Sequence, residues 1–145
     1  MAVKFPKVGP QHLLEKDPTF PAKKRFIQEA YNMWRLNEDQ HQNFPVLLGY
    51  NTESFPYHII TKFEEYGCLL QLVRKSRKGN PKVKPTQLLK MLIGISDALL
   101  YLEKLGLVHR AIMAENILVG DNFVCKLSGL HALKQLTVGS SNGGN

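Results

Sequence analysis

The stretch LGLVHRAIMAENILVGDNFVCKLSGLHAL, residues 105–133, carries the most informative pattern in this 145-residue chain. Its second half has short apolar runs on either side of the turn residues Gly-Asp-Asn at 120–122, which is typical of a β-hairpin. Its first half begins with His109 and Arg110, and Ala111 follows them directly. The stretch therefore predicts a polar loop that leads into a hairpin.

The segment before this loop predicts one long helix. Apolar residues cover nearly the whole helical circumference over 88–105, with Thr86 as the expected N-cap and Gly106 as the expected C-cap. A helix that is apolar on all sides is typical of a buried scaffold element. Because Lys90 and Asp97 interrupt the run, a bilayer-spanning helix would be too costly, and no transmembrane segment is predicted.

A second helix is predicted over 22–36, where apolar residues follow the i, i+3, i+4, i+7 spacing of an amphipathic helix. Met33 and Trp34 are expected in the core, and Glu29 falls at the edge of the apolar stripe, so that its carboxylate can point inward. The other predicted elements are strands at 1–5, 44–50 and 55–63, a proline-rich loop at 6–21 and a small, polar, disordered stretch at 137–145.

Composition and charge narrow the class of protein. Cys68 and Cys125 lie far apart, and the residues around them lack the spacing of zinc ligands, which indicates a reducing, cytoplasmic compartment rather than a disulfide framework. No secretory signal peptide is recognised at the start. The net charge of +7 comes from one segment, since residues 71–90 hold seven Lys or Arg and no acid, while the rest of the chain balances.

Two interpretations of this basic segment remain open. It can form a patch for phosphate, nucleic acid or anionic lipid, which would make binding steeply dependent on salt. The alternative is a solvated loop, which Gly79 and Pro81 favour because they break any helical periodicity, and because no aromatic side chains interleave as stacking platforms. We therefore do not expect a nucleic-acid partner.

The order of predicted elements, together with several short motifs, resembles a protein kinase domain of the tyrosine-kinase type. "AVK" and "FIQEA" resemble the strand lysine and helix glutamate motifs, and "YLEKLGLVHR" followed by "NILVGDN" resembles the scaffold helix and catalytic loop. Residues 41–79 are similar to the Abelson-like kinases. The resemblance implies an α+β, partial two-lobed fold, with a partial small lobe at 1–66, a partial large lobe at 67–133 and a disordered tail at 134–145.

The same resemblance implies roles for particular residues. Lys4 would contact the ATP phosphates and pair with Glu29, Thr61 would be the gatekeeper at the start of the hinge, and Asn116 would be a metal-binding asparagine. His109 is expected to pack and hydrogen-bond in the core of the loop rather than take part in chemistry. The candidate nucleotide pocket consists of Lys4, Glu29, Thr61, Lys62, Phe63 and Asn116.

Three departures from the family pattern point away from catalysis. Ala111 stands where the catalytic aspartate belongs, and a methyl group cannot accept the proton of a substrate hydroxyl. Gly129 stands where the metal-binding aspartate belongs, which leaves Asn116 as the only side-chain ligand, so magnesium is not expected. Glu115 replaces a cation that would meet the γ-phosphate. ATP binding stays open, because the alternative explanation of Lys4 and Glu29 is a surface ion pair or an unpaired lysine.

The sequence therefore predicts a pseudokinase-type domain, shortened at both ends, that binds a protein partner, for example another kinase domain, and regulates it. The alternative is part of a protein tyrosine kinase that binds ATP and phosphorylates proteins. That alternative needs carboxylates where Ala111 and Gly129 stand.

Overall fold

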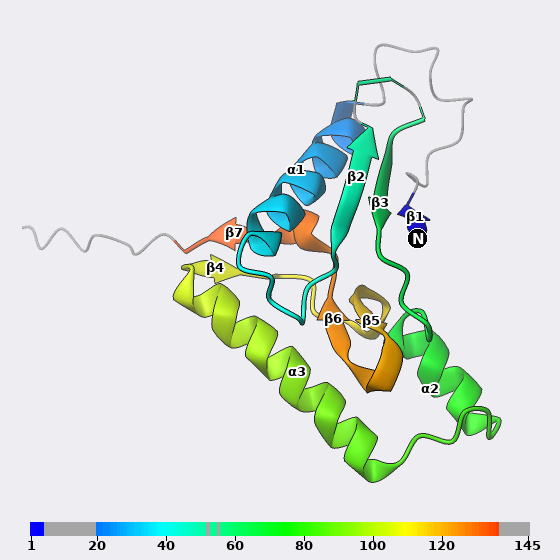
Figure 1. Ribbon diagram of the computed structural model, residues 1–145. Coiled ribbons are helices and arrows are strands. Elements are labelled where there is room, and N and C mark those ends of the chain that lie inside the picture. The colour runs from blue at the N-terminus through cyan, green and yellow to red at the C-terminus, as the bar shows by residue number, and fades with distance from the viewer. Residues whose placement is uncertain (5–19, 52, 55, 137–145) are drawn as a thin grey trace, which may run out of the picture.

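The computed structural model describes residues 1–4, 20–51, 53–54 and 56–136. Within them, helices and small antiparallel sheets form two layers, with the sheet of β1, β2 and β3 above and the hairpin of β5 and β6 below (Figure 1). The helices are α1 (Phe20–Asn37), α2 (Leu69–Arg77) and α3 (Pro85–Lys104). The strands are β1 (Ala2–Lys4), β2 (Leu47–Asn51), β3 (His58–Thr61), β4 (Leu107–Val108), β5 (Ile117–Val119), β6 (Cys125–Leu127) and β7 (Lys134–Gln135). This mixed architecture confirms the predicted α+β class and is consistent with a partial kinase fold.

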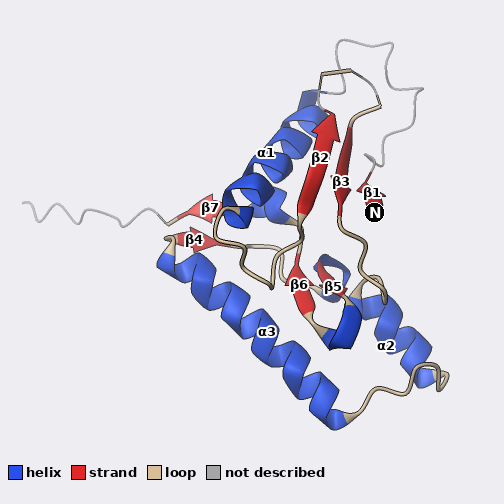
Figure 2. Ribbon diagram, in the orientation of Figure 1, coloured by secondary structure: helices blue, strands red, loops and turns tan. Residues whose placement is uncertain are grey.

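Helix α1 packs beside the upper sheet, whose strand order is β1-β3-β2 (Figure 2). Its inner face is apolar, because Phe26, Ala30 and Met33 are buried together with Ile59 of β3. Trp34 was expected in the core as well, but its side chain is 53% exposed, so that prediction is wrong. The reason is geometric, since Trp34 follows Met33 by about 100° around the helix and lies past the edge of the buried stripe.

Helix α3 runs beneath the hairpin (Figure 1). Its sequence is apolar on all sides, but only one of its faces is buried. Its buried face is made by Met91, Gly94, Ala98 and Leu102. The opposite face exposes large apolar side chains, such as Leu92, which is 66% exposed. The prediction of a helix buried on all sides is therefore wrong for the described part of the chain.

The ends of α3 differ slightly from the prediction. Pro85 occupies the first turn and Lys84 is the N-cap, in place of Thr86, because proline needs no N–H donor at this position. Leu105 is the C-cap, and Gly106 follows it with φ of +67°, a left-handed conformation that glycine adopts without strain. The glycine signal thus marked the end of the helix to within one residue.

The lower layer contains the predicted hairpin and one ribbon that was not predicted. Strands β5 and β6 pair antiparallel, whereas β4, directly after α3, pairs with β7. The tail was expected to be disordered from residue 134, but β7 extends the ordered part, and residues 137–145 lie outside the described range. The proline-rich loop lies mostly outside it too. No helix in the described part combines the length and apolar character that a membrane crossing requires.

Candidate functional site

His109 supports the loop between β4 and β5 from inside. Its side chain is only 2% exposed, and its Nε2 donates to the carbonyl oxygen of Ser128 at 2.9 Å. Its Nδ1 accepts the backbone N–H of Ala111 at 3.2 Å, so both ring nitrogens are engaged by main-chain groups. Burial lowers the pKa of His109, which favours the neutral ring that these two bonds require. The prediction that this histidine packs and bonds within the loop is confirmed.

The next two residues face outward. Arg110 has a φ of +63° and an exposed side chain whose Nε donates to the carbonyl oxygen of Ala132 at 2.8 Å. Ala111 is partly buried and offers only a methyl group. Since a methyl group neither accepts nor donates a proton, this point of the loop has no acid–base capacity of its own.

Asn116 closes the loop onto the segment that follows β6. Its Nδ2 donates to the carbonyl oxygen of Ala111 at 2.8 Å, while its own carbonyl oxygen accepts both the N–H of Ser128 at 2.7 Å and the Ser128 hydroxyl at 2.9 Å. The amide also fills the space beside Gly129, because a Cβ at that glycine would lie 2.7 Å from Asn116 Nδ2 and 2.8 Å from its Cγ. Gly129 has φ of +78°. The Asn116 amide thus occupies the space that a side chain at position 129 would need.

The residues after Gly129 attach this loop to helix α1. Leu130 is fully buried, and its carbonyl oxygen accepts Nδ2 of the buried Asn32 at 2.6 Å. His131 lies against the same helix, with its Nε2 at 2.9 Å from Nη2 of Arg25 and its Nδ1 at 3.6 Å from Oε2 of Glu29. We call these contacts between α1 and residues 130–131 the α1 clamp.

The contacts of the α1 clamp also indicate which ring nitrogen of His131 carries the proton. A guanidinium can only donate hydrogen bonds, so His131 Nε2 must accept from Arg25, which leaves the proton on Nδ1. That N–H faces the carboxylate of Glu29, whose side chain is 3% exposed. Glu29 therefore does point inward as expected, and its neighbour is a neutral hydrogen-bond donor from the C-terminal part of the chain.

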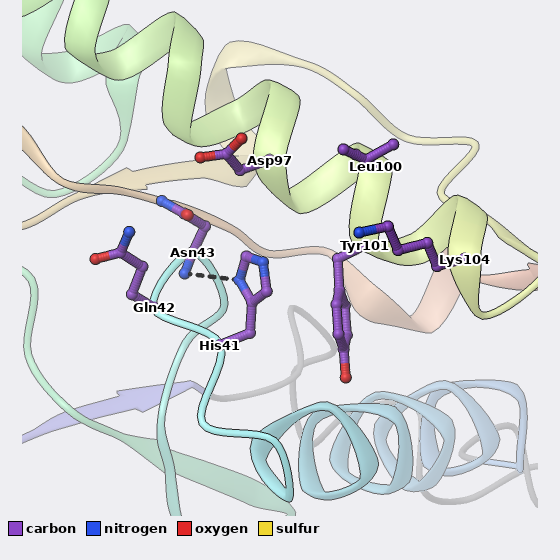
Figure 3. A pocket seen from close by; sticks show the side chains of 7 residues that line it. All are labelled: His41, Gln42, Asn43, Asp97, Leu100, Tyr101 and Lys104. Carbon is purple, nitrogen blue, oxygen red and sulfur yellow. Dashed lines mark hydrogen bonds between the residues drawn. The ribbon is translucent and has the colours of Figure 1, made fainter.

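A second set of polar side chains joins the loop after α1 to α3 around a cavity of about 360 Å³ (Figure 3). The ring of His41 lies 4.7 Å from that of Tyr101, and the Tyr101 hydroxyl donates to the Asp39 carboxylate. Burial and this hydrogen bond raise the pKa of Tyr101 to about 12. Asn43 donates to the carbonyl oxygen of Cys125 at 2.8 Å. These contacts fix the upper layer on the lower one, and we assign them a structural role.

The same chain was compared with known proteins. The family model described as protein tyrosine and serine/threonine kinase matches residues 12–140. The chain belongs to the protein kinase family. Curated relatives are tyrosine kinases: it is 38% identical over 112 residues to the transforming protein Abl of Abelson murine leukemia virus, covering 77% of this chain and 14% of that protein. It is 38% identical over 117 residues to zebrafish (Danio rerio) ephrin type-B receptor 4b, covering 81% of this chain and 11% of the receptor.

A further relative is human tyrosine-protein kinase ABL2, with 37% identity over 112 residues, or 77% of this chain and 9% of the relative. The chain thus spans only a small part of the length of each of these relatives. Membership of the kinase family confirms the resemblance stated from the motifs. By the motif resemblance, the loop at His109 would correspond to the kinase catalytic loop.

The metal that kinases use does not fit the side chains at this position. Magnesium prefers carboxylate oxygens, yet Ala111 and Gly129 supply none. The amide of Asn116 already donates to Ala111 and lies against Gly129. The acidic residues nearest in sequence, Glu115 and Asp121, are both exposed, and within the described ranges no three His, Cys, Asp or Glu residues gather as a ligand group. We therefore derive no step that involves a metal.

The candidate nucleotide residues are only partly brought together. Strand β1 places Lys4 opposite Ile59 of β3, two residues before Thr61, whereas the side chain of Lys4 and its predicted pairing with Glu29 lie outside the described part. Thr61 is half-buried at the end of β3, and the N–H of Lys62 donates to the carbonyl oxygen of Val46 at 3.0 Å. Phe63 is 59% exposed. Among the candidate residues whose side chains the structure describes, none lines the cavity around His41 and Tyr101.

The α1 clamp is the feature that the sequence did not reveal. Arg25 and His131 are 106 positions apart, so no local spacing or periodicity connects them. The only available signal was the histidine itself, which stands where the family motif has its final glycine. A polar, ring-bearing residue there indicated that the segment makes contacts of its own.

Proposed function

We propose that this chain does not transfer phosphate and acts as a pseudokinase-type module that binds a protein and regulates it. The observation that carries the proposal is the loop of Ala111, Asn116 and Gly129, in which the asparagine amide is engaged by main-chain and glycine atoms rather than directed at a ligand. Two unpaired thiols, Cys68 and Cys125, favour a reducing compartment such as the cytoplasm.

Loss of the base alone would slow transfer strongly. General acid–base catalysis typically contributes roughly 10²–10⁴-fold to a rate. In kinases the other large contribution comes from metal ions that bridge the phosphates, and here Gly129 supplies no carboxylate where the resemblance places the metal-binding aspartate. Because phosphoryl transfer depends on positioning and electrostatics, the two losses together leave little of the machinery.

A binding role is supported by how firmly the loop and helix α1 are held. The α1 clamp, the bonds of His109 and the bonds of Asn116 fix one arrangement of the two layers without any ligand. A surface that is held in one conformation loses less entropy when a partner docks on it. By favouring one state of that partner, for example a complete kinase domain, such a module shifts its active population.

The direct test is a phosphate-transfer assay on the purified chain. We expect no incorporation of labelled phosphate from ATP into a tyrosine-containing peptide, with magnesium or with manganese, under conditions in which an active tyrosine kinase domain is readily measured. The variant Asn116→Ala removes the remaining family ligand, and Glu115→Gln in the same loop is the matched control. Incorporation that Asn116→Ala abolishes and Glu115→Gln preserves would overturn the proposal and restore the kinase alternative.

A further inference from the structure

The groove between α2 and α3 is an apolar cavity of about 290 Å³ that no other part of the described chain fills. Leu72 and Met91, which are 1% and 4% exposed, line it, together with Val73 and Leu88, which are 37% and 46% exposed. The Ser76 hydroxyl accepts the N–H of Val83 at 3.3 Å and ties the connecting loop to α2. We call this feature the α2–α3 groove.

Most residues that line this groove come from residues 71–90, the segment that carries the whole charge imbalance of the protein. The seven cations of residues 71–90 are all exposed: Arg74, Lys75, Arg77, Lys78, Lys82, Lys84 and Lys90. Arg77 itself lines the groove. Among the residues that the structure describes, none of the seven has a carboxylate within salt-bridge distance. The groove is therefore formed by a segment whose positive charge has no salt-bridge partner among the described residues.

We infer that the α2–α3 groove is a docking site for an acidic amphipathic segment of a partner protein. Its apolar side chains enter the groove, and its Asp or Glu residues face the surrounding cations. This inference rests on the proposed binding function and specifies the chemistry of the partner. The cavity is smaller than the roughly 300–1,000 Å³ typical of sites for drug-sized ligands, which suits one or two side chains rather than a whole cofactor.

Two other anionic partners fit less well. Proteins that bind single-stranded nucleic acid present aromatic side chains on which bases stack, and residues 69–91 contain no aromatic residue. A lipid surface is met by apolar side chains that project from a helix face, as Leu92 of α3 does, but the groove itself is recessed, because Leu72 and Met91 are almost fully covered. A protruding peptide side chain reaches such recessed atoms and a flat bilayer does not.

The test uses the full chain and a fluorescent 14-residue peptide that carries two leucines four positions apart and six glutamates. We expect saturable binding, measured by anisotropy, that weakens at least tenfold between 0.1 and 1 M NaCl, because the Debye length falls from roughly 10 to 3 Å over that range. A peptide with the glutamates replaced by lysines is the charge control. A phosphatidylserine vesicle and a dT20 oligonucleotide are the alternative probes.

Two variants locate the site. Leu88→Asp places a carboxylate at the exposed wall of the groove, and Arg77→Glu reverses the charge of the cation that lines it; we expect each to weaken peptide binding at least tenfold. The matched controls are Leu100→Asp and Lys104→Glu, exposed positions near the far end of α3, which should change affinity less than twofold. Circular dichroism and thermal unfolding verify that each variant is folded.

The inference is overturned if Leu88→Asp binds the peptide as tightly as the original chain, or if vesicles or dT20 bind more tightly than the peptide. These outcomes leave the proposed lack of phosphate transfer intact, since that is measured separately. Conversely, phosphate transfer by a chain whose peptide binding depends on Leu88 would overturn the proposed function alone.

Discussion

Replacing Gly129 by alanine is the most direct test of how the loop is built. The backbone there has φ of +78°, and the added Cβ would lie 2.7 Å from Asn116 Nδ2 and 2.8 Å from Asn116 Cγ. The third of the nearest atoms, at 3.1 Å, is also part of the Asn116 amide. Because real Cβ atoms do not approach other atoms this closely, the amide must move.

The expected loss of stability has two parts. A residue with a Cβ in the left-handed region costs about 1–2 kcal/mol. Displacing Asn116 also breaks its hydrogen bond to the carbonyl oxygen of Ala111, a bond worth about 0.5–1.5 kcal/mol. We therefore expect Gly129→Ala to lower the free energy of unfolding by about 1.5–3.5 kcal/mol.

A double-mutant cycle separates the two parts. In an Asn116→Ala background all three contacting atoms are absent, so Gly129→Ala should cost only about 1–2 kcal/mol, the conformational part. Urea unfolding followed by circular dichroism gives each free energy by linear extrapolation, and the slope m should stay constant across the four proteins.

Additive costs of the two substitutions would refute this explanation of the loop. Non-interacting sites add to within about 0.3–0.5 kcal/mol. If Gly129→Ala costs the same in both backgrounds within that limit, Asn116 does not occupy the space beside Gly129, and the loop is not shaped around the missing side chain. A neutral effect of Gly129→Ala in the original chain would contradict the left-handed conformation as well.

Three further predictions concern other buried groups. Asn32→Ala should lower the free energy of unfolding by about 1–3 kcal/mol, because the buried carbonyl oxygen of Leu130 loses its donor. The exposed Lys24→Ala on the same helix serves as a control, and urea unfolding measures both. Burial raises the pKa of Cys125 to about 11, so iodoacetamide at pH 8 should leave this thiol unmodified until the protein unfolds, as peptide mass spectrometry would show. Burial lowers the pKa of His109 below its unfolded value of about 6.5, so the unfolded state binds more protons as the pH falls. The free energy of unfolding should therefore decrease below about pH 6.5. Unfolding measured at pH 5.0 and 7.5 should show a smaller decrease in His109→Gln.

Much of the fold could be predicted from sequence because its elements have local signals. The hairpin of β5 and β6 follows from two apolar runs and a turn, and α1 follows from a helical period that also places Glu29 inward. The ribbon of β4 and β7 could not be found this way. Each of its strands has only two residues, too few for a period, and their pairing depends on the fold around them.

The direction in which helices face was less predictable than their existence. An apolar residue at every helical angle cannot tell which side is covered, and α3 shows this, because Leu92 is exposed while Met91 beside it is buried. Gly94 was a usable signal in retrospect. A Cβ there would lie 2.7 Å from Asn43 Nδ2, so the absence of a side chain marks the face where another segment approaches closely.

The candidate site involves two kinds of group: the side chains that hold the loop in place by hydrogen bonds, and the positions at which catalysis would need carboxylates. The bonds that hold it run from the side chains of His109, Asn116 and Asn32 to backbone carbonyl oxygens, and every residue supplies such an oxygen whatever its side chain. Substituting alanine or glycine for a carboxylate therefore leaves these bonds available, whereas base and metal chemistry depend on the lost oxygens themselves. Shape and catalysis are separable in this loop for that reason. Under the proposed function, the domain keeps this shape without catalysis, and a surface held in one conformation, such as the α2–α3 groove, binds a partner with a smaller loss of entropy.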